Sequence, residues 1–125
     1  MEKIGIIGSG TWGTAIAVLL VNNGHEVTLW SAIPAEIEEM AKTRTHKNLP
    51  GVTLPEGLIY TADLEEAMKD KNLLVMAVPS VFVRSTAQKM KPFCKNGQIV
   101  VDVAKGIEEQ SLMTMSQVIE EELPL

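Results

Sequence analysis

Short apolar runs alternate along the chain with longer stretches in which apolar residues recur every three or four positions. The apolar runs are short and rich in branched residues, which predicts strands. They lie at 4–7, 26–30, 58–61, 72–78 and 98–103. The first run is apolar throughout, as expected of a strand buried on both faces. The stretches between the runs predict helices at 13–23, 34–41, 63–68, 81–90 and 111–122.

Residues at the expected helix ends support these boundaries. Asn22-Asn23-Gly24 is a C-terminal stop, and Pro34 suits a first helical turn. Asp63 is an N-cap candidate with Glu66 as its capping-box partner, and Ser111 or a neighbour opens the last helix. Alternation of strands and helices predicts one doubly wound α/β domain, a parallel sheet of order 3-2-1-4-5 with helices on both faces.

Between 43 and 57 the helical and strand patterns lapse, and the segment contains Pro50-Gly51 and Pro55-Glu56-Gly57. A loop of this length in a compact domain is typically functional or mobile. His46 lies in this loop, where a ligand role is one interpretation, whereas His25 is expected at a helix end near the surface.

Composition narrows the classes of partner. The chain has 125 residues, 46% hydrophobic and 22% charged, with net charge −5 and no cluster of basic residues. These values fit one folded domain and disfavour nucleic-acid binding. No apolar stretch approaches the roughly 18 residues of a membrane span. Cys94 is the only cysteine, so we expect no internal disulfide and no cysteine-rich metal site. Because the first apolar run is also too short for a signal-peptide core, we expect a cytoplasmic location.

A glycine-rich segment follows the first strand and opens the first helix. It reads Gly8-Ser9-Gly10-Thr11-Trp12-Gly13 and fits the pattern G-x-G-x-x-G. In this context the pattern indicates a dinucleotide site, in which all six residues surround the cofactor. Gly8 allows a tight turn, Gly10 a close approach to the pyrophosphate, and Gly13 close packing of the helix. The alternative is a glycine turn that only packs tightly.

The end of the second strand bears on the choice of nucleotide. NAD sites usually place Asp or Glu there to accept from the ribose 2′-OH, and FAD sites share this habit. Here no acid occurs from Trp30 until Glu36. We therefore expect an NAD(P) site that slightly favours NADP, with Arg44 or Lys47 of the loop as candidates to reach a 2′-phosphate.

Two further strand ends lie at the predicted crevice, because the carboxyl ends of parallel strands share one edge of the sheet. Pro79 follows the fourth strand and is a candidate cofactor contact. Lys105 follows the fifth, where its ammonium group could meet a phosphate or a substrate oxygen. A solvated lysine at a strand end is the plainer interpretation of Lys105 from spacing alone. No catalytic triad, carboxylate pair or metal-ligand spacing is present.

Five segments in this order resemble the N-terminal domain of bacterial NAD(P)-dependent glycerol-3-phosphate dehydrogenases. They are GSGTWGTA at 8–15, NGHEVTLW at 23–30, NLPG at 48–51, AVPS at 77–80 and AKGIE at 104–108. The resemblance implies a Rossmann-type fold and reversible hydride transfer between NAD(P)H and dihydroxyacetone phosphate, giving sn-glycerol 3-phosphate for phospholipid synthesis.

Residue roles follow from the same resemblance. Thr11, Trp12, Ala32 and Asn48 would contact the cofactor, and Lys105 both the cofactor and the phosphorylated substrate. The chain departs from the family at Ala32, where Arg or His is common, and at Asn48, where an aromatic residue is common. Both departures concern the choice of nucleotide.

Family members are much longer than this chain, and a helical second domain supplies their proton-exchanging lysine. The resemblance therefore implies that residues 1–125 are the NAD(P)-binding domain, without a catalytic residue, which binds nucleotide but does not turn over. A homodimer is an open alternative. So are two other functions: another two-domain reductase, of 3-hydroxyacid or ketopantoate type, and a non-catalytic nucleotide-sensing module.

Overall fold

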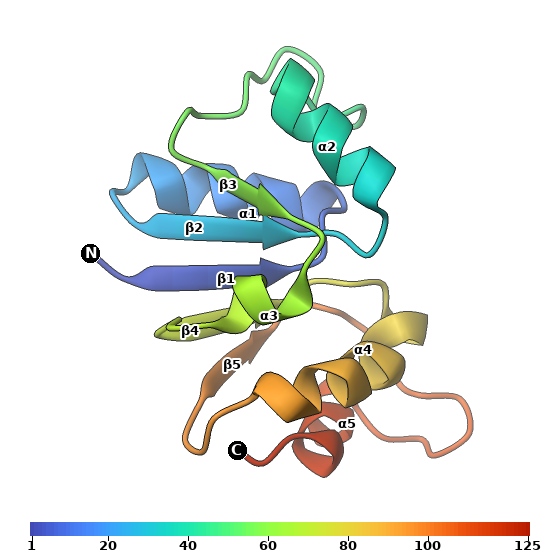
Figure 1. Cartoon of the computed structure of the whole chain (residues 1–125). Helices are drawn as coiled ribbons and strands as arrows, with labels where there is room; N and C mark the ends of the chain where they lie inside the picture. Colours follow the sequence, from blue (N-terminus) through green and yellow to red (C-terminus); the bar gives the residue numbers. More distant parts are fainter.

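A single five-stranded sheet forms the centre of the molecule (Figure 1). The computed structural model describes all 125 residues. All strands run parallel in the order β3-β2-β1-β4-β5, which confirms the predicted topology. The strands are β1 (Lys3–Ile7), β2 (Glu26–Trp30), β3 (Ile59–Thr61), β4 (Leu73–Met76) and β5 (Ile99–Asp102).

Helices cover both faces of this sheet. The helices are α1 (Thr11–Asn22), α2 (Pro34–Thr43), α3 (Leu64–Met68), α4 (Val83–Met90) and α5 (Met115–Glu122). Short 3₁₀ turns, η1 (Ser80–Phe82) and η2 (Lys91–Phe93), flank α4. Because α1 and α2 lie on one face and the other three on the opposite face, the domain is doubly wound (Figure 1). None of these helices is both long and apolar enough to span a bilayer.

Alternation along β1 divides the interior into two cores. Ile4 and Ile6 face α1 and α2, whereas Ile7 faces the helices of the other side. All three are almost fully buried, and burying each isoleucine contributes roughly 1.5–3 kcal/mol. Gly5 also points toward α3, where a Cβ would overlap the carbonyl oxygen of Ala67. The first apolar run is thus buried on both faces, as predicted.

Two helix ends differ from the sequence prediction. Asp63 does cap α3, accepting from Glu65 N at 3.0 Å. The predicted capping-box bond between Glu66 and Asp63 N is wrong, because Asp63 N instead donates to Thr61 Oγ1 at 2.9 Å. The last helix begins after Thr114 rather than near Ser111, since the Ser111 hydroxyl donates to Glu108 Oε1 at 2.6 Å.

The strand β5 forms one edge of the sheet and is less buried than its apolar sequence suggests. Val100 packs on the core beneath α4 and α5, but Ile99 and Val101 are 59% and 42% exposed. On the opposite face of the sheet, helices α1 and α2 pack mainly over β1, β2 and β3 and do not extend over β5. The outer face of β5 therefore lacks a covering layer.

Candidate functional site

Residues 8–13, here called the glycine loop, join β1 to α1. Gly8 has φ +127°, and a Cβ there would lie 2.7 Å from both Ala77 C and Val78 N. A Cβ on Gly13 would overlap the carbonyl oxygen of Gly8. These contacts confirm the structural roles predicted for Gly8 and Gly13, a tight turn and a close approach of helix to sheet.

Gly10 differs from both, because a Cβ there would meet nothing within 4 Å. It is the N-cap of α1, so no side chain caps this helix, and the first turn contains no acidic residue. The first N–H groups of a helix lack intrahelical acceptors and carry the positive end of the helix dipole. The loop thus presents donors beside open space, which suits a phosphate.

A cleft of about 510 Å³ opens at the carboxyl ends of β1, β4 and β5. We call it the strand-end cleft. Five predicted site residues line it: Gly10, Thr11, Trp12, Pro79 and Lys105. The remaining lining residues are Ala77, Val78, Ser80, Val103 and Ala104. The structure therefore brings segments far apart in the sequence to one concave surface with apolar walls and one ammonium group.

Lys105 lies in the loop 103–113 between β5 and α5, here called the lysine loop. Its start is tied to the sheet, since Val103 N donates to Met76 O at 3.0 Å and Ala104 N to Asp102 Oδ1 at 2.9 Å. Burial raises the pKa of the Asp102 carboxyl, and the Ala104 N–H opposes that rise. Gly106 has φ +127°, which turns the chain directly after Lys105.

Charged side chains hold the lysine loop against α4 and α5. Arg84 meets both oxygens of Glu108, with Nε–Oε2 at 2.7 Å and Nη2–Oε1 at 2.8 Å. Its Nη1 also contacts Glu121 at 2.7 Å and Glu122 at 2.6 Å. Hydrogen bonds to these carboxylates raise the pKa of Arg84, and the bond from Arg84 lowers the pKa of Glu108 to about 2.

Residues 44–58, here called the long loop, fold back onto the glycine loop. Their base is closed by Leu54 N to Arg44 O at 2.8 Å and by Arg44 Nε to Leu54 O at 2.9 Å. Farther along, His46 Nε2 lies 3.0 Å from Ser9 O, and Asn48 Nδ2 donates to Thr11 Oγ1 at 3.1 Å. Asn48 is thus beside the cleft, whereas Arg44 closes the base of the loop and does not line the cleft.

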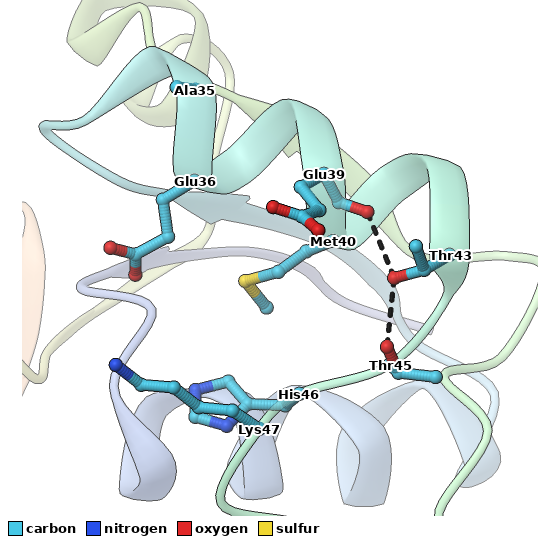
Figure 2. A pocket seen from close by; sticks show the side chains of 8 residues that line it. All are labelled: Ala35, Glu36, Glu39, Met40, Thr43, Thr45, His46 and Lys47. Atoms are coloured by element: carbon cyan, nitrogen blue, oxygen red, sulfur yellow. Dashed lines mark hydrogen bonds between the residues drawn. The ribbon is translucent and has the colours of Figure 1, made fainter.

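A second cavity, about 490 Å³, lies between α2 and the long loop (Figure 2). We call it the α2 cavity. Glu36, Glu39, Met40 and Thr43 line it from one face of the helix, and Lys47 is among the loop residues opposite. The other lining residues are Ala35, Thr45 and His46.

The α2 cavity adjoins the glycine loop, because Ser9 Oγ donates to Glu36 Oε1 at 3.2 Å. Ala32 is exposed in the turn before α2 and lines neither cavity. Sequence reasoning missed the contacts of Glu36 and His46 with the glycine loop. The helical spacing of 36, 39, 40 and 43 marks one face of α2, but no pattern indicates what that face meets.

Comparisons of the sequence with known proteins give one family. A family model described as NAD-dependent glycerol-3-phosphate dehydrogenase N-terminus matches residues 3–125. A glycerol-3-phosphate dehydrogenase [NAD(P)+] of Agathobacter rectalis is 55% identical over 125 residues, which are 99% of this chain and 37% of that protein.

Solved structures agree with this. The glycerol-3-phosphate dehydrogenase of Coxiella burnetii superposes with a TM-score of 0.91 at 29% identity, covering 99% of this chain and 38% of that one. A UDP-glucose dehydrogenase of Pyrobaculum islandicum reaches a TM-score of 0.74 at 19% identity, covering 99% and 33%. That second likeness shows the fold alone. The chain spans little more than a third of the length of the two glycerol-3-phosphate dehydrogenases.

Proposed function

The chain belongs to the NAD-dependent glycerol-3-phosphate dehydrogenase family as its N-terminal, NAD(P)-binding domain, and from this premise we propose that the strand-end cleft holds the pyrophosphate and nicotinamide of the cofactor. One observation carries the proposal. Five residues selected from the sequence converge on a single cleft beside an uncapped helix N-terminus. A dinucleotide needs this combination, because its pyrophosphate is anionic and its nicotinamide ring is largely apolar.

Each residue then has a distinct task. The N–H groups after Gly10 donate to the pyrophosphate, and Trp12 and Pro79 form walls of the cleft. Asn48 and Ala32 lie toward the adenosine end, Asn48 through its bond to Thr11. Lys105 places a positive charge where the cofactor and a phosphorylated substrate meet.

For the whole protein we propose reversible reduction of dihydroxyacetone phosphate to sn-glycerol 3-phosphate, in the cytoplasm and for phospholipid synthesis. One hydride passes from NAD(P)H to the carbonyl carbon, and one proton completes the new hydroxyl. Hydride transfer needs cofactor and substrate held in near-attack geometry. We expect residues 1–125 alone to bind nucleotide without turnover, because much of the substrate's surroundings must come from the rest of such an enzyme.

We also propose a slight preference for NADPH over NADH. The turn between β2 and α2 carries no carboxylate that would repel a 2′-phosphate. The nearest acid, Glu36, is hydrogen-bonded to Ser9, and Lys47 lines the same cavity with opposite charge.

The test is Gly10→Ser, measured by calorimetric titration with NADPH and NADH. A serine N-cap stabilises a helix by a few tenths of a kcal/mol relative to glycine, and a Cβ at this position is free of protein contacts. Its hydroxyl oxygen would accept from the N–H groups that the pyrophosphate requires. We expect unchanged or slightly higher stability together with at least about tenfold weaker binding, or about 1.4 kcal/mol.

Gly57→Ser is the matched control, because its Cβ would make only an ordinary contact with Val21 Cγ1 at 3.4 Å, away from the cleft. It should leave both dissociation constants unchanged. Equal affinity of the Gly10→Ser variant and the unmodified chain would contradict the proposal, as would failure of the unmodified chain to bind either nucleotide at millimolar concentration.

A further inference from the structure

Three hydrogen bonds connect four residues of two loops. His46 Nε2 contacts Ser9 O at 3.0 Å, and Asn48 N donates to His46 Nδ1 at 3.1 Å. Asn48 Nδ2 then donates to Thr11 Oγ1 at 3.1 Å. Ser9 and Thr11 belong to the glycine loop, His46 and Asn48 to the long loop. These bonds therefore join two segments that are 37 residues apart in sequence.

The two backbone partners fix the protonation pattern of His46. A backbone N–H can only donate and a carbonyl oxygen can only accept. Nδ1 must therefore be the acceptor toward Asn48, and Nε2 must carry the proton toward Ser9. His46 is only 8% exposed, which limits competition from water for both partners.

Ser9 O is the oxygen on which this arrangement converges. It accepts from the Thr14 hydroxyl at 3.0 Å as well as facing His46 Nε2 at 3.0 Å. A carbonyl oxygen has two lone pairs, so both are used. His46 lines the α2 cavity and not the strand-end cleft. The Ser9 carbonyl is therefore held on the side of the glycine loop away from the cleft.

We propose that His46 is a positioning residue for dinucleotide binding: its Nε2–H holds the Ser9 carbonyl away from the cleft and so keeps the following N–H groups directed at the pyrophosphate. The inference rests on the proposed function of that cleft. Its physical basis is electrostatic, because a carbonyl dipole turned toward the pyrophosphate would repel it, whereas amide N–H groups attract it. His46 itself does not touch the cofactor.

Two substitutions separate the two bonds of His46. The side-chain amide of His46→Gln can reach Ser9 as a donor, as Nε2 does, but offers nothing at the Nδ1 position. His46→Asn offers an oxygen near the Nδ1 position for Asn48 N and is too short to reach Ser9 O. His46→Leu removes both bonds and keeps an apolar side chain of similar size. A role limited to filling space predicts no advantage of Gln over Leu.

The measurement is calorimetric titration of the 125-residue chain and these variants with NADH and with ADP-ribose, which shares the pyrophosphate. We expect His46→Gln to bind both within about threefold of the unmodified chain. His46→Asn and His46→Leu should bind both about tenfold more weakly, the size expected for misplacing one hydrogen-bonded group. Melting temperatures, recorded in parallel, should fall for all three variants. A loss of stability is then common to all three, whereas a loss of affinity is confined to His46→Asn and His46→Leu.

His25 provides the control, being the only other histidine. Its Nδ1 likewise accepts from a backbone amide, Glu2 N at 3.0 Å, at the opposite end of the strands. His25→Leu should lower the melting temperature without changing either dissociation constant.

Failure of the unmodified chain to bind NADH or ADP-ribose would overturn the proposed function and this inference with it. If the unmodified chain binds, two results would overturn the inference alone: wild-type affinity in His46→Leu, or affinity in His46→Gln as weak as in His46→Leu.

Discussion

The two loops beside the glycine loop are attached to the domain by different chemistry. The long loop is held through neutral groups, with His46 on Ser9 O and Asn48 on Thr11 Oγ1. The start of the lysine loop is tied to the sheet by backbone N–H groups, but its contacts with α4 and α5 are charged, with Arg84 between Glu108 and the two carboxylates at the end of α5. Both loops border the proposed cofactor site, one at the adenosine end and one at the nicotinamide end.

Because of this difference, the two loops should respond differently to ionic strength and to pH. Neutral hydrogen bonds depend on distance and direction and are little affected by salt. The cluster at Arg84 places three carboxylates around one guanidinium, so its strength depends on ionic strength and on whether the carboxylates are ionised. Hydrogen-bond geometry therefore holds the long loop, and charge holds the part of the lysine loop that contacts α4 and α5.

The largest effect should come from Gly13, in the glycine loop that lies beside both of these loops. In Gly13→Ala the new Cβ would overlap the Gly8 carbonyl oxygen and lie 3.2 Å from Ala77 Cβ. The helix α1 must then move off the sheet. We expect the free energy of unfolding to fall by about 3 kcal/mol, the upper range for overpacking, as measured by urea denaturation. Gly57→Ala is the control and should change it by less than about 1 kcal/mol; similar losses in both variants would contradict this assignment.

The next largest effect is an acid dependence of stability that we expect from the lysine loop and not from the long loop. The pKa of Glu108 is about 2 in the folded chain, against an ordinary value of 4.5. A lowered folded pKa means that the ion pair's contribution to stability is fully present above pH 4.5 and is lost as pH falls from 4.5 toward 2. Glu108→Gln removes this contribution, so urea unfolding of that variant should depend less on pH in this window.

The matched control for that experiment is Glu109→Gln, because the adjacent Glu109 makes no ion pair. It should keep the acid dependence of the unmodified chain. The hydrogen-exchange protection of residues 44–51 should be the same in both variants at neutral pH. Equal acid dependence in Glu108→Gln and Glu109→Gln would show that the Arg84 cluster does not control the acid response.

Much of the fold follows from local patterns in the sequence. Strand order is predictable because alternating strands and helices with right-handed crossovers leave few topologies. The glycine loop is predictable because only glycine tolerates the φ of Gly8 and the contact at Gly13. Pro79 and Lys105 could be placed at the cleft because carboxyl ends of parallel strands share one edge.

The remaining features depend on contacts between distant segments. The bond between His46 and Ser9 spans 37 positions, and that between Arg84 and Glu108 spans 24. No periodicity encodes such pairs. Local chemistry also misled where two partners competed for one group. The Asp63 amide, which was expected to bond with Glu66, donates to Thr61 Oγ1, and the Ser111 hydroxyl donates to Glu108 Oε1.

The two smallest predicted effects test whether the two attachments are independent. Thr114 caps α5 by accepting from Gln117 N at 3.3 Å, while Gln117 Oε1 accepts from Thr114 N at 2.9 Å. Thr114→Ala removes the hydroxyl and should cost about 1 kcal/mol. Because α5 carries Glu121 and Glu122, loosening its first turn should also loosen the Arg84 cluster. Hydrogen exchange should therefore speed up in residues 103–122 and stay unchanged in residues 44–51.

Thr43→Ala is the reciprocal variant on the long-loop side. Its hydroxyl donates to Glu39 O at 3.0 Å and lies 2.8 Å from Thr45 Oγ1. The higher helix propensity of alanine offsets part of that loss, so the change in stability should be only a few tenths of a kcal/mol. Faster exchange should be confined to the neighbourhood of residues 43–48. If either variant loosened both loops equally, neutral and charged attachments would be parts of one cooperative unit, because independent attachments cannot transmit a loss of this size across the sheet.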